Sequence, residues 1–198
     1  MPWPVVLASA SPRRQELLAQ IVDAFEVLPA GIDEKSVVPA DPIDLARTLA
    51  TRKAEVVFEL RAGAMVIGAD TIVVLDPEVL NKPVDVAQAR EMLAALSGRT
   101  HIVITGIALM WPPDERIVFA DSAKVTFRTL TAPEIDAYVA SGEPMDKAGA
   151  YAIQGGAAKF VTALEGDRDT VIGLPTKRIH EFLGNIANKA GSRSASPP

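Results

Sequence analysis

Residues 5–18, VVLASASPRRQELL, contain the first strand-to-helix transition of the chain. Val5 to Ala8 form an apolar run typical of a short buried strand, and Arg13 to Val22 carry leucine and isoleucine at helical spacing. Ser11 suits the N-cap position, and Pro12 stands at the first helical position, where a backbone N–H has no partner to lose. The segment therefore predicts a buried strand that passes through a short polar turn into a helix.

Outward from this segment, apolar strand patterns alternate with helical ones and then give way to a hairpin. We expect further strands at residues 25–28, 65–69, 72–75, 101–110, 117–129 and 160–161. We expect further helices at residues 44–61, 86–96, 133–140 and 174–186. Early alternation followed by a hairpin indicates an α/β protein with a mixed central sheet flanked by helices. We expect residues 1–187 to form one domain and the polar residues 188–198 to form a disordered tail.

The composition excludes several classes of protein. Hydrophobic residues make up 48% of the chain and charged residues 23%, as in an ordinary soluble globule. There is no cysteine and there are only two histidines, which excludes disulfides, thiolate zinc sites and multi-histidine metal sites. The net charge of −5 provides no basic field for nucleic acid or anionic lipid. Because no targeting signal or membrane-spanning run is visible, we expect a cytoplasmic protein without nucleic-acid or membrane partners.

Two adjacent arginines open the expected first helix. Arg13 and Arg14 lie in a first turn where Asp or Glu is normally favoured, because the helix macrodipole already places positive charge there. Together with the hydroxyls of Ser9 and Ser11, they form an anion receptor suited to phosphate. Exposure of both arginines to solvent, or their pairing with Asp or Glu elsewhere on the protein, explains the pattern equally well.

Asp70 follows the apolar run at 65–69 and is expected to close that strand. A partly desolvated carboxylate at the end of a strand can bind a divalent cation or take a proton from water. An aspartate that hydrogen-bonds its own turn is the structural alternative.

Three lysines and a glycine-rich segment are weaker candidates for a ligand site. Lys53, Lys82 and Lys147 are each more typical of solvated surface lysines, although the proline after Lys82 restricts its backbone. The segment 148–156 is rich in glycine and alanine, which allows a ligand to approach the backbone closely. It lacks the Gly-Lys-Ser/Thr of a P-loop.

Several of these segments together carry a family resemblance. They are LASASPRRQELL at 7–18, GIDE at 31–34, KA at 53–54, GADT at 68–71, NKP at 81–83, LSGRTH at 96–101, TG at 105–106, the stretch 138–155, and GLP at 173–175. In this order they resemble the Maf family of septum-formation-associated nucleotide pyrophosphatases, over essentially the whole chain up to the tail. The resemblance implies metal-dependent hydrolysis of nucleoside triphosphates between the α- and β-phosphates. It also implies two lobes with the site in the cleft between them, similar to inosine-triphosphate pyrophosphatases, and a house-cleaning role with a link to arrest of septation.

The resemblance and the chemistry of a triphosphate together give expected roles. The expected catalytic residues are Asp70, Lys82, Lys53 and Glu34; the expected substrate-binding residues are Ser9, Ser11, Arg13, Arg14, Thr71 and Gln154; and the expected metal ligands are Asp70 and Glu34. Mg²⁺ or Mn²⁺ is the expected cofactor, since only oxygen ligands are available. Whether Asp70 acts as a base, as a metal ligand or as both stays open.

Three positions separate branches of the family by substrate. Arg13, Thr71 and Gln154 match the pattern of the branch that acts on dTTP and UTP. The sequence departs from the family where Arg168 and Thr170 replace a usual Tyr and Asn, which leaves the base preference less determined than the reaction. The alternatives are a preference for 7-methyl-GTP or other modified nucleotides, and a nucleotide-binding regulator of division without turnover. The family also suggests a homodimer.

Overall fold

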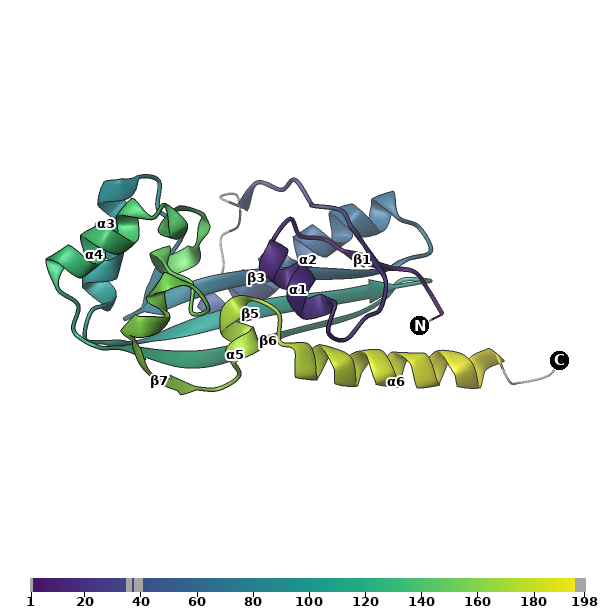
Figure 1. Cartoon of the computed structure of the whole chain (residues 1–198). Coiled ribbons are helices and arrows are strands. Elements are labelled where there is room, and N and C mark those ends of the chain that lie inside the picture. The colour runs from purple at the N-terminus through teal and green to yellow at the C-terminus, as the bar shows by residue number, and fades with distance from the viewer. Residues whose placement is uncertain (1, 35–36, 38–40, 195–198) are drawn as a thin grey trace.

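The structure is a computed structural model that describes residues 2–34, 37 and 41–194 (Figure 1). The strands are β1 (Val5–Leu7), β2 (Phe25–Val27), β3 (Met65–Leu75), β4 (Glu78–Leu80), β5 (Thr100–Trp111), β6 (Glu115–Phe127) and β7 (Val161–Glu165). The α-helices are α1 (Pro12–Leu18), α2 (Pro42–Leu60), α3 (Val86–Leu96), α4 (Ala132–Ala140), α5 (Arg168–Ile172) and α6 (Thr176–Ser194). Short 3-10 helices are η2 (Glu143–Asp146), η3 (Ala148–Ala150) and η4 (Gly156–Phe160). None of the helices described is both long and apolar enough to cross a membrane.

A single mixed sheet runs through the molecule in the order β2-β1-β3-β5-β6-β7, with β4 added beside the far end of β3. β1 pairs in parallel with both β2 and β3, whereas β3, β5, β6 and β7 pair in antiparallel fashion. The expected mixed α/β architecture is confirmed.

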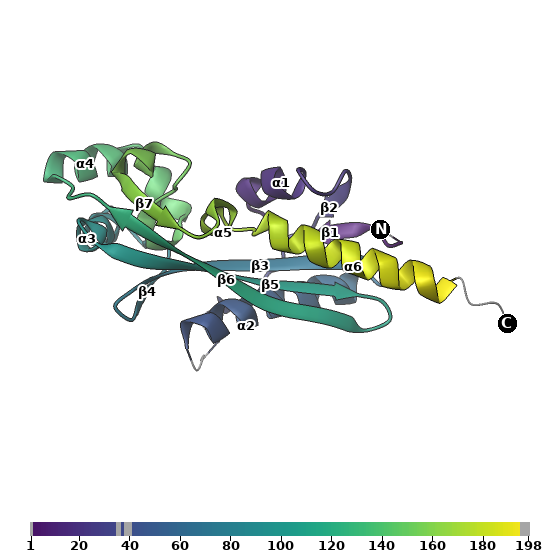
Figure 2. The same ribbon diagram turned by 90° about the horizontal axis from the view of Figure 1, so that it is seen from below.

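Helices cover both faces of this sheet, with α2 on one face and α1 and α6 on the other (Figure 2). The approach of α2 is close because the residues that it turns towards the sheet, Ala46, Ala50 and Ala54, are small and fully buried. A Cβ atom on Gly106 would overlap the carbonyl oxygen of Ala46, and one on Gly68 would overlap the carbonyl oxygen of Ala50. Small residues on both elements therefore hold α2 against the centre of the sheet.

The core is divided between two lobes at opposite ends of the sheet. In one lobe α3, α4 and the 3-10 segments pack on β5–β7 around Phe127, Tyr151 and Phe160. In the other lobe β1, α1 and α6 enclose Leu7, Leu18 and other apolar side chains. Figure 1 shows the two groups of helices separated along the length of the long strands. The expected two-lobed arrangement is thus present.

Several expected boundaries differ from the structure. β3 runs without a break through Asp70, because β5 pairs with it continuously from residue 66 to residue 74. The expectation that Asp70 closes a strand is therefore wrong. α1 ends at Leu18 rather than at residue 22. α6 continues to Ser194, so residues 188–194 of the expected disordered tail are helical, since a helix that is already nucleated adds residues at little cost. Residues 195–198 lie outside the described part of the chain.

Candidate functional site

The site is built around an opening in the ladder of β3. β1 pairs with β3 only as far as Ile67, and β4 pairs with it only from Val73 onward. Within the described strands, the intervening residues 68–72 are therefore paired on the β5 side alone. The chain leaving β1 turns away here into α1, which is the kind of position where α/β sheets place their ligands.

A cavity of about 1180 Å³ occupies this opening and extends between the two lobes. Its walls include all ten residues expected from the sequence, namely Ser9, Ser11, Arg13, Arg14, Glu34, Lys53, Asp70, Thr71, Lys82 and Gln154. Ser9 to Arg14 come from the lobe of β1 and α1, while Gln154 comes from the lobe of α3 and α4. Segments that are far apart in sequence thus converge on one cavity large enough for a nucleotide.

Lys53 lies between two carboxylates in the cavity wall. Its Nζ atom is 2.6 Å from Asp70 Oδ1 and 2.7 Å from Glu34 Oε1. Asp70 is 7% exposed, whereas half of the Glu34 side chain is exposed. Lys53 reaches Asp70 because α2 packs tightly on the sheet face from which Asp70 projects. One ammonium group therefore compensates a buried and a half-exposed carboxylate.

The two carboxylates differ in acidity. Burial raises the pKa of Asp70 above its ordinary value, although Lys53 and Arg14 pull in the opposite direction. Burial acts in the same sense on Glu34, but there the hydrogen bond and charge of Lys53, helped by Lys82, lower the pKa below its ordinary value. Neighbouring carboxylates with divergent pKa values are suited to different roles, with Asp70 as the better proton acceptor and Glu34 as the permanent anion.

Arg14 is bonded to the protein through all three of its guanidinium nitrogens. Nε donates to the carbonyl of Gly173 (2.9 Å), Nη1 to Ser9 Oγ (3.1 Å) and Nη2 to Thr71 Oγ1 (3.0 Å). Burial lowers the pKa of Arg14, and the nearby charge of Asp70 opposes that effect. Arg14 thus joins the turn after β1 to β3 and to the segment between α5 and α6.

The hydroxyl of Thr71 is also engaged on its other side. It lies 2.9 Å from Thr105 Oγ1, which in turn donates to the backbone carbonyl of Thr170 (2.7 Å). Because α5 contributes a backbone carbonyl here, this contact does not depend on which side chain stands at position 170. Arg168, the other departure from the family pattern, is exposed and is not part of the cavity wall.

Arg13 contrasts with Arg14. Its Nε is buried and has no hydrogen-bond partner within the described residues. Burial opposes the ionisation of Asp146 in the opposite lobe, but Lys147, with a smaller contribution from the charge of Arg13, lowers the pKa of that carboxyl below its ordinary value. Because an unsatisfied buried N–H is costly, this guanidinium is suited to an anionic ligand in the cavity.

Asp70 and Glu34 are the expected metal ligands, and both line the cavity. No three or more His, Cys, Asp or Glu side chains cluster for a metal ion among residues 2–34, 37 and 41–194. Asp70 and Glu34 nevertheless converge on one cation, Lys53 Nζ. Mg²⁺ is commonly held by one or two carboxylates plus substrate phosphates, and this donor pair fits that pattern.

Lys147, which the sequence pattern favoured as a solvated surface lysine, lines the cavity. Its side chain is 11% exposed, and Nζ donates to the carbonyl of Glu143 (2.7 Å) and to Asp146 Oδ1 (2.5 Å). The sequence feature that points to this position is that Lys147 directly precedes the glycine-rich segment 148–156, which a ligand can approach closely. His101 is buried away from this site, and its Nε2 lies 2.8 Å from the hydroxyl of Tyr151.

The chain is similar to known proteins in both sequence and fold. The family model described as "Maf-like protein" matches residues 4–186. The dTTP/UTP pyrophosphatase of Symbiobacterium thermophilum is 49% identical over 179 residues, which is 90% of this chain and 92% of that protein. The dTTP/UTP pyrophosphatase of Moorella thermoacetica is 49% identical over 181 residues, or 90% of this chain and 93% of that protein. The structure of the Staphylococcus aureus Ham1 protein, 15% identical, has the same fold with a TM-score of 0.56 and covers 92% of this chain and 98% of that one.

Proposed function

The chain belongs to the Maf-like protein family, and from that premise we propose that it hydrolyses dTTP and UTP to the nucleoside monophosphate and pyrophosphate. The observation that carries the proposal is the buried Asp70–Lys53 pair in a cavity that also contains Arg13 and Lys82. A carboxylate repels phosphates, so a site for binding alone gains nothing from it. A hydrolytic reaction does need such a carboxylate, because a base must accept a proton from the attacking water.

Arg13 and Lys82 would bind the phosphates. The free N–H of Arg13 supports a direct contact, and Lys82 is close enough to Glu34 to lower its pKa. Ser11 adds a hydroxyl on the same wall. Charge-assisted hydrogen bonds of this kind are shorter and stronger than neutral ones, which suits the charge that develops on departing pyrophosphate.

Arg14 and Thr71 would act by positioning rather than by touching the phosphates. The three nitrogens of Arg14 already have protein acceptors, one of which is the hydroxyl of Ser9. In this proposal Arg14 fixes the turn after β1, and Thr71 links that turn to β5. Of the two adjacent arginines, Arg13 is therefore the one proposed to contact the phosphates, together with Lys82 and Ser11.

Asp70 would orient the attacking water and accept its proton. Burial raises its pKa, which makes it a stronger base than an exposed aspartate, and Lys53 keeps it ionised. Asp70 and Glu34 would also hold Mg²⁺ or Mn²⁺ together with phosphate oxygens of the substrate. When bound, the ion supplies charge neutralisation on the phosphates and lowers the pKa of water.

A substrate panel tests the proposal. Pyrophosphate release is measured with dTTP, UTP, CTP and 7-methyl-GTP, with and without Mg²⁺, for the wild type and for Asp70→Asn. We expect metal-dependent turnover that favours dTTP and UTP and falls by about three orders of magnitude or more in Asp70→Asn, which should bind nucleotide and remain folded. Preference for 7-methyl-GTP would support the other branch of the family. Nucleotide binding without turnover in the wild type would support a regulator.

Some expectations from the sequence remain proposals of the same kind. We place the activity in the cytoplasm, without nucleic-acid or membrane partners. A homodimer and a link to septation also remain predictions, and size-exclusion chromatography with light scattering checks the first of these.

A further inference from the structure

We propose that Tyr138 and Glu143 are positioning residues that set Gln154 for recognition of the nucleotide base. This inference rests on the proposed function and deepens it. It assigns selectivity among bases to a pair of side chains in the lobe of α3 and α4, apart from the phosphate-binding wall formed by Arg13 and Lys82.

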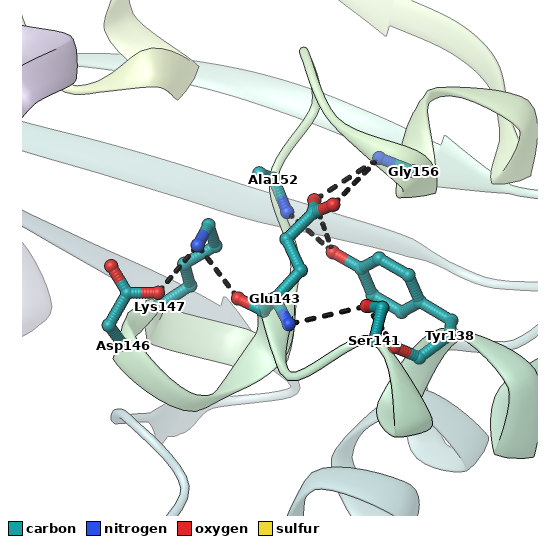
Figure 3. A network of polar contacts seen from close by, with 7 residues as sticks. All are labelled: Tyr138, Ser141, Glu143, Asp146, Lys147, Ala152 and Gly156. Atoms are coloured by element: carbon teal, nitrogen blue, oxygen red, sulfur yellow. Dashed lines mark hydrogen bonds and ion pairs between the residues drawn. The ribbon is translucent and has the colours of Figure 1, made fainter.

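The two side chains hold both ends of the short segment that carries Gln154 (Figure 3). The hydroxyl of Tyr138 accepts from the backbone N–H of Ala152 (3.2 Å) and donates to Glu143 Oε1 (2.9 Å). The carboxylate of Glu143 accepts from the backbone N–H of Gly156, 3.0 Å from Oε2. The fixed N–H groups therefore lie two residues before and two residues after Gln154, which lines the cavity.

Glycines provide the space for the carboxylate. A Cβ atom on Gly155 would overlap the carboxylate of Glu143. A Cβ atom on Gly156 would lie 3.2 Å from the ring of Tyr138, which is tighter than ordinary contact. The Gly155–Gly156 pair thus allows the backbone to lie directly against these side chains.

Tyr138 is fixed by burial and by packing against Phe160. It is 4% exposed, and its ring meets that of Phe160 edge-on, with centroids 5.4 Å apart. Burial, together with the hydrogen bond to Glu143, raises the pKa of Tyr138, so its phenol remains a hydrogen-bond donor.

Glu143 is likewise fixed through its backbone. Its N–H donates to Ser141 Oγ (3.2 Å), and its carbonyl accepts from Lys147 Nζ (2.7 Å). Both partners of the Gln154 segment are therefore immobilised by contacts outside that segment, which is what a positioning pair requires.

The expected consequence is a change in base selectivity. An amide offers an acceptor and donors that can pair with the edge of a base, whereas the arginine and lysine contacts reach phosphates that all nucleotides share. Hydrogen bonds discriminate between bases only when the donor and acceptor groups are correctly placed. If the Gln154 amide is displaced, the enzyme should therefore lose base selectivity while it still binds the phosphates. UTP and CTP differ only at the base edge, and the ratio of their kcat/KM values isolates this effect.

The experiment compares Tyr138→Phe, Glu143→Ala and Glu143→Gln with the wild type, using pyrophosphate release from UTP and CTP. We expect the first two variants to lower the UTP-to-CTP ratio about tenfold, mainly through a higher KM for UTP. Glu143→Gln keeps a carbonyl acceptor and should retain most of the selectivity. The matched control is Glu134→Ala on α4. It removes hydrogen bonds to Arg128 and Thr131 away from the cavity and should lower thermal stability without changing the ratio.

A double-variant test separates positioning from a general structural effect. If Glu143 acts through Gln154, Glu143→Ala added to Gln154→Ala changes the ratio no further. Additive losses, or equal losses on both substrates in Tyr138→Phe and Glu143→Ala, would overturn the inference. So would a wild type that hydrolyses UTP and CTP equally well. A wild type that hydrolyses neither nucleotide would overturn the proposed function itself, which is a different and recognisable result.

Discussion

Replacing Lys53 by Met tests the electrostatics of the cavity wall. Lys53 is the ammonium that lies 2.6 Å from Asp70 and 2.7 Å from Glu34, and methionine fills a similar volume without the charge. Removing one partner of a buried ion pair costs about 3–5 kcal/mol, because the other charge stays buried. Glu34 is half exposed, and its share is therefore about 1 kcal/mol or less. The nearby charge of Arg14 still favours the ionised form of Asp70, so we expect a loss of about 3 kcal/mol.

The effect of Asp70→Asn on the free energy of unfolding should change sign when Lys53 is replaced by Met. In the wild type, Asp70→Asn should cost about 1 kcal/mol, because Lys53 keeps Glu34 and the amide oxygen still accepts. In the Lys53→Met background the same change removes a buried charge that has lost its ion-pair partner Lys53, and it should raise the free energy of unfolding. Urea denaturation at neutral pH with a chelator present measures all four proteins, and pyrophosphate release should remain lost in the double variant. Equal destabilisation by Asp70→Asn in both backgrounds would refute the reasoning.

Three further predictions concern other parts of the molecule. Burial lowers the pKa of His101 to about 4, so its stabilising contribution is present above pH 6.5 and is lost as the pH falls towards 4. Urea titrations across this range should show the wild type losing roughly 3 kcal/mol more than His101→Gln. Gly106→Ala should cost about 2 kcal/mol or more in the same assay, because the new Cβ atom overlaps the carbonyl of Ala46 on α2, whereas Gly184→Ala on α6 has open space and should not destabilise. Arg13→Ala should raise the KM for UTP about tenfold or more in steady-state assays, and the deficit should shrink at high salt; a small, salt-independent change would contradict a phosphate contact.

The sequence alone identified ten of the residues that line the cavity. The apolar patterns located most helices and strands, and the family resemblance selected ten residues that the fold brings around one cavity. This was possible because a strand or a helix start depends largely on its own side chains and their spacing. The same local pattern wrongly predicted that the strand ends at Asp70, because a polar residue interrupts the apolar run there. Pairing with β5, formed from residues more than thirty positions away, carries the strand through.

The tertiary structure decided which charged groups face a ligand and which face the protein. Arg13 and Arg14 are adjacent and identical in chemistry, yet Arg14 donates to Gly173, 159 residues away, while Arg13 keeps a buried N–H without a described partner. The contacts of Glu143 with the Gln154 segment and the burial of Lys147 are equally invisible in the sequence. Side-chain chemistry and periodicity are properties of a few neighbouring residues, whereas desolvation and hydrogen-bond partners depend on what distant parts of the folded chain place beside each group.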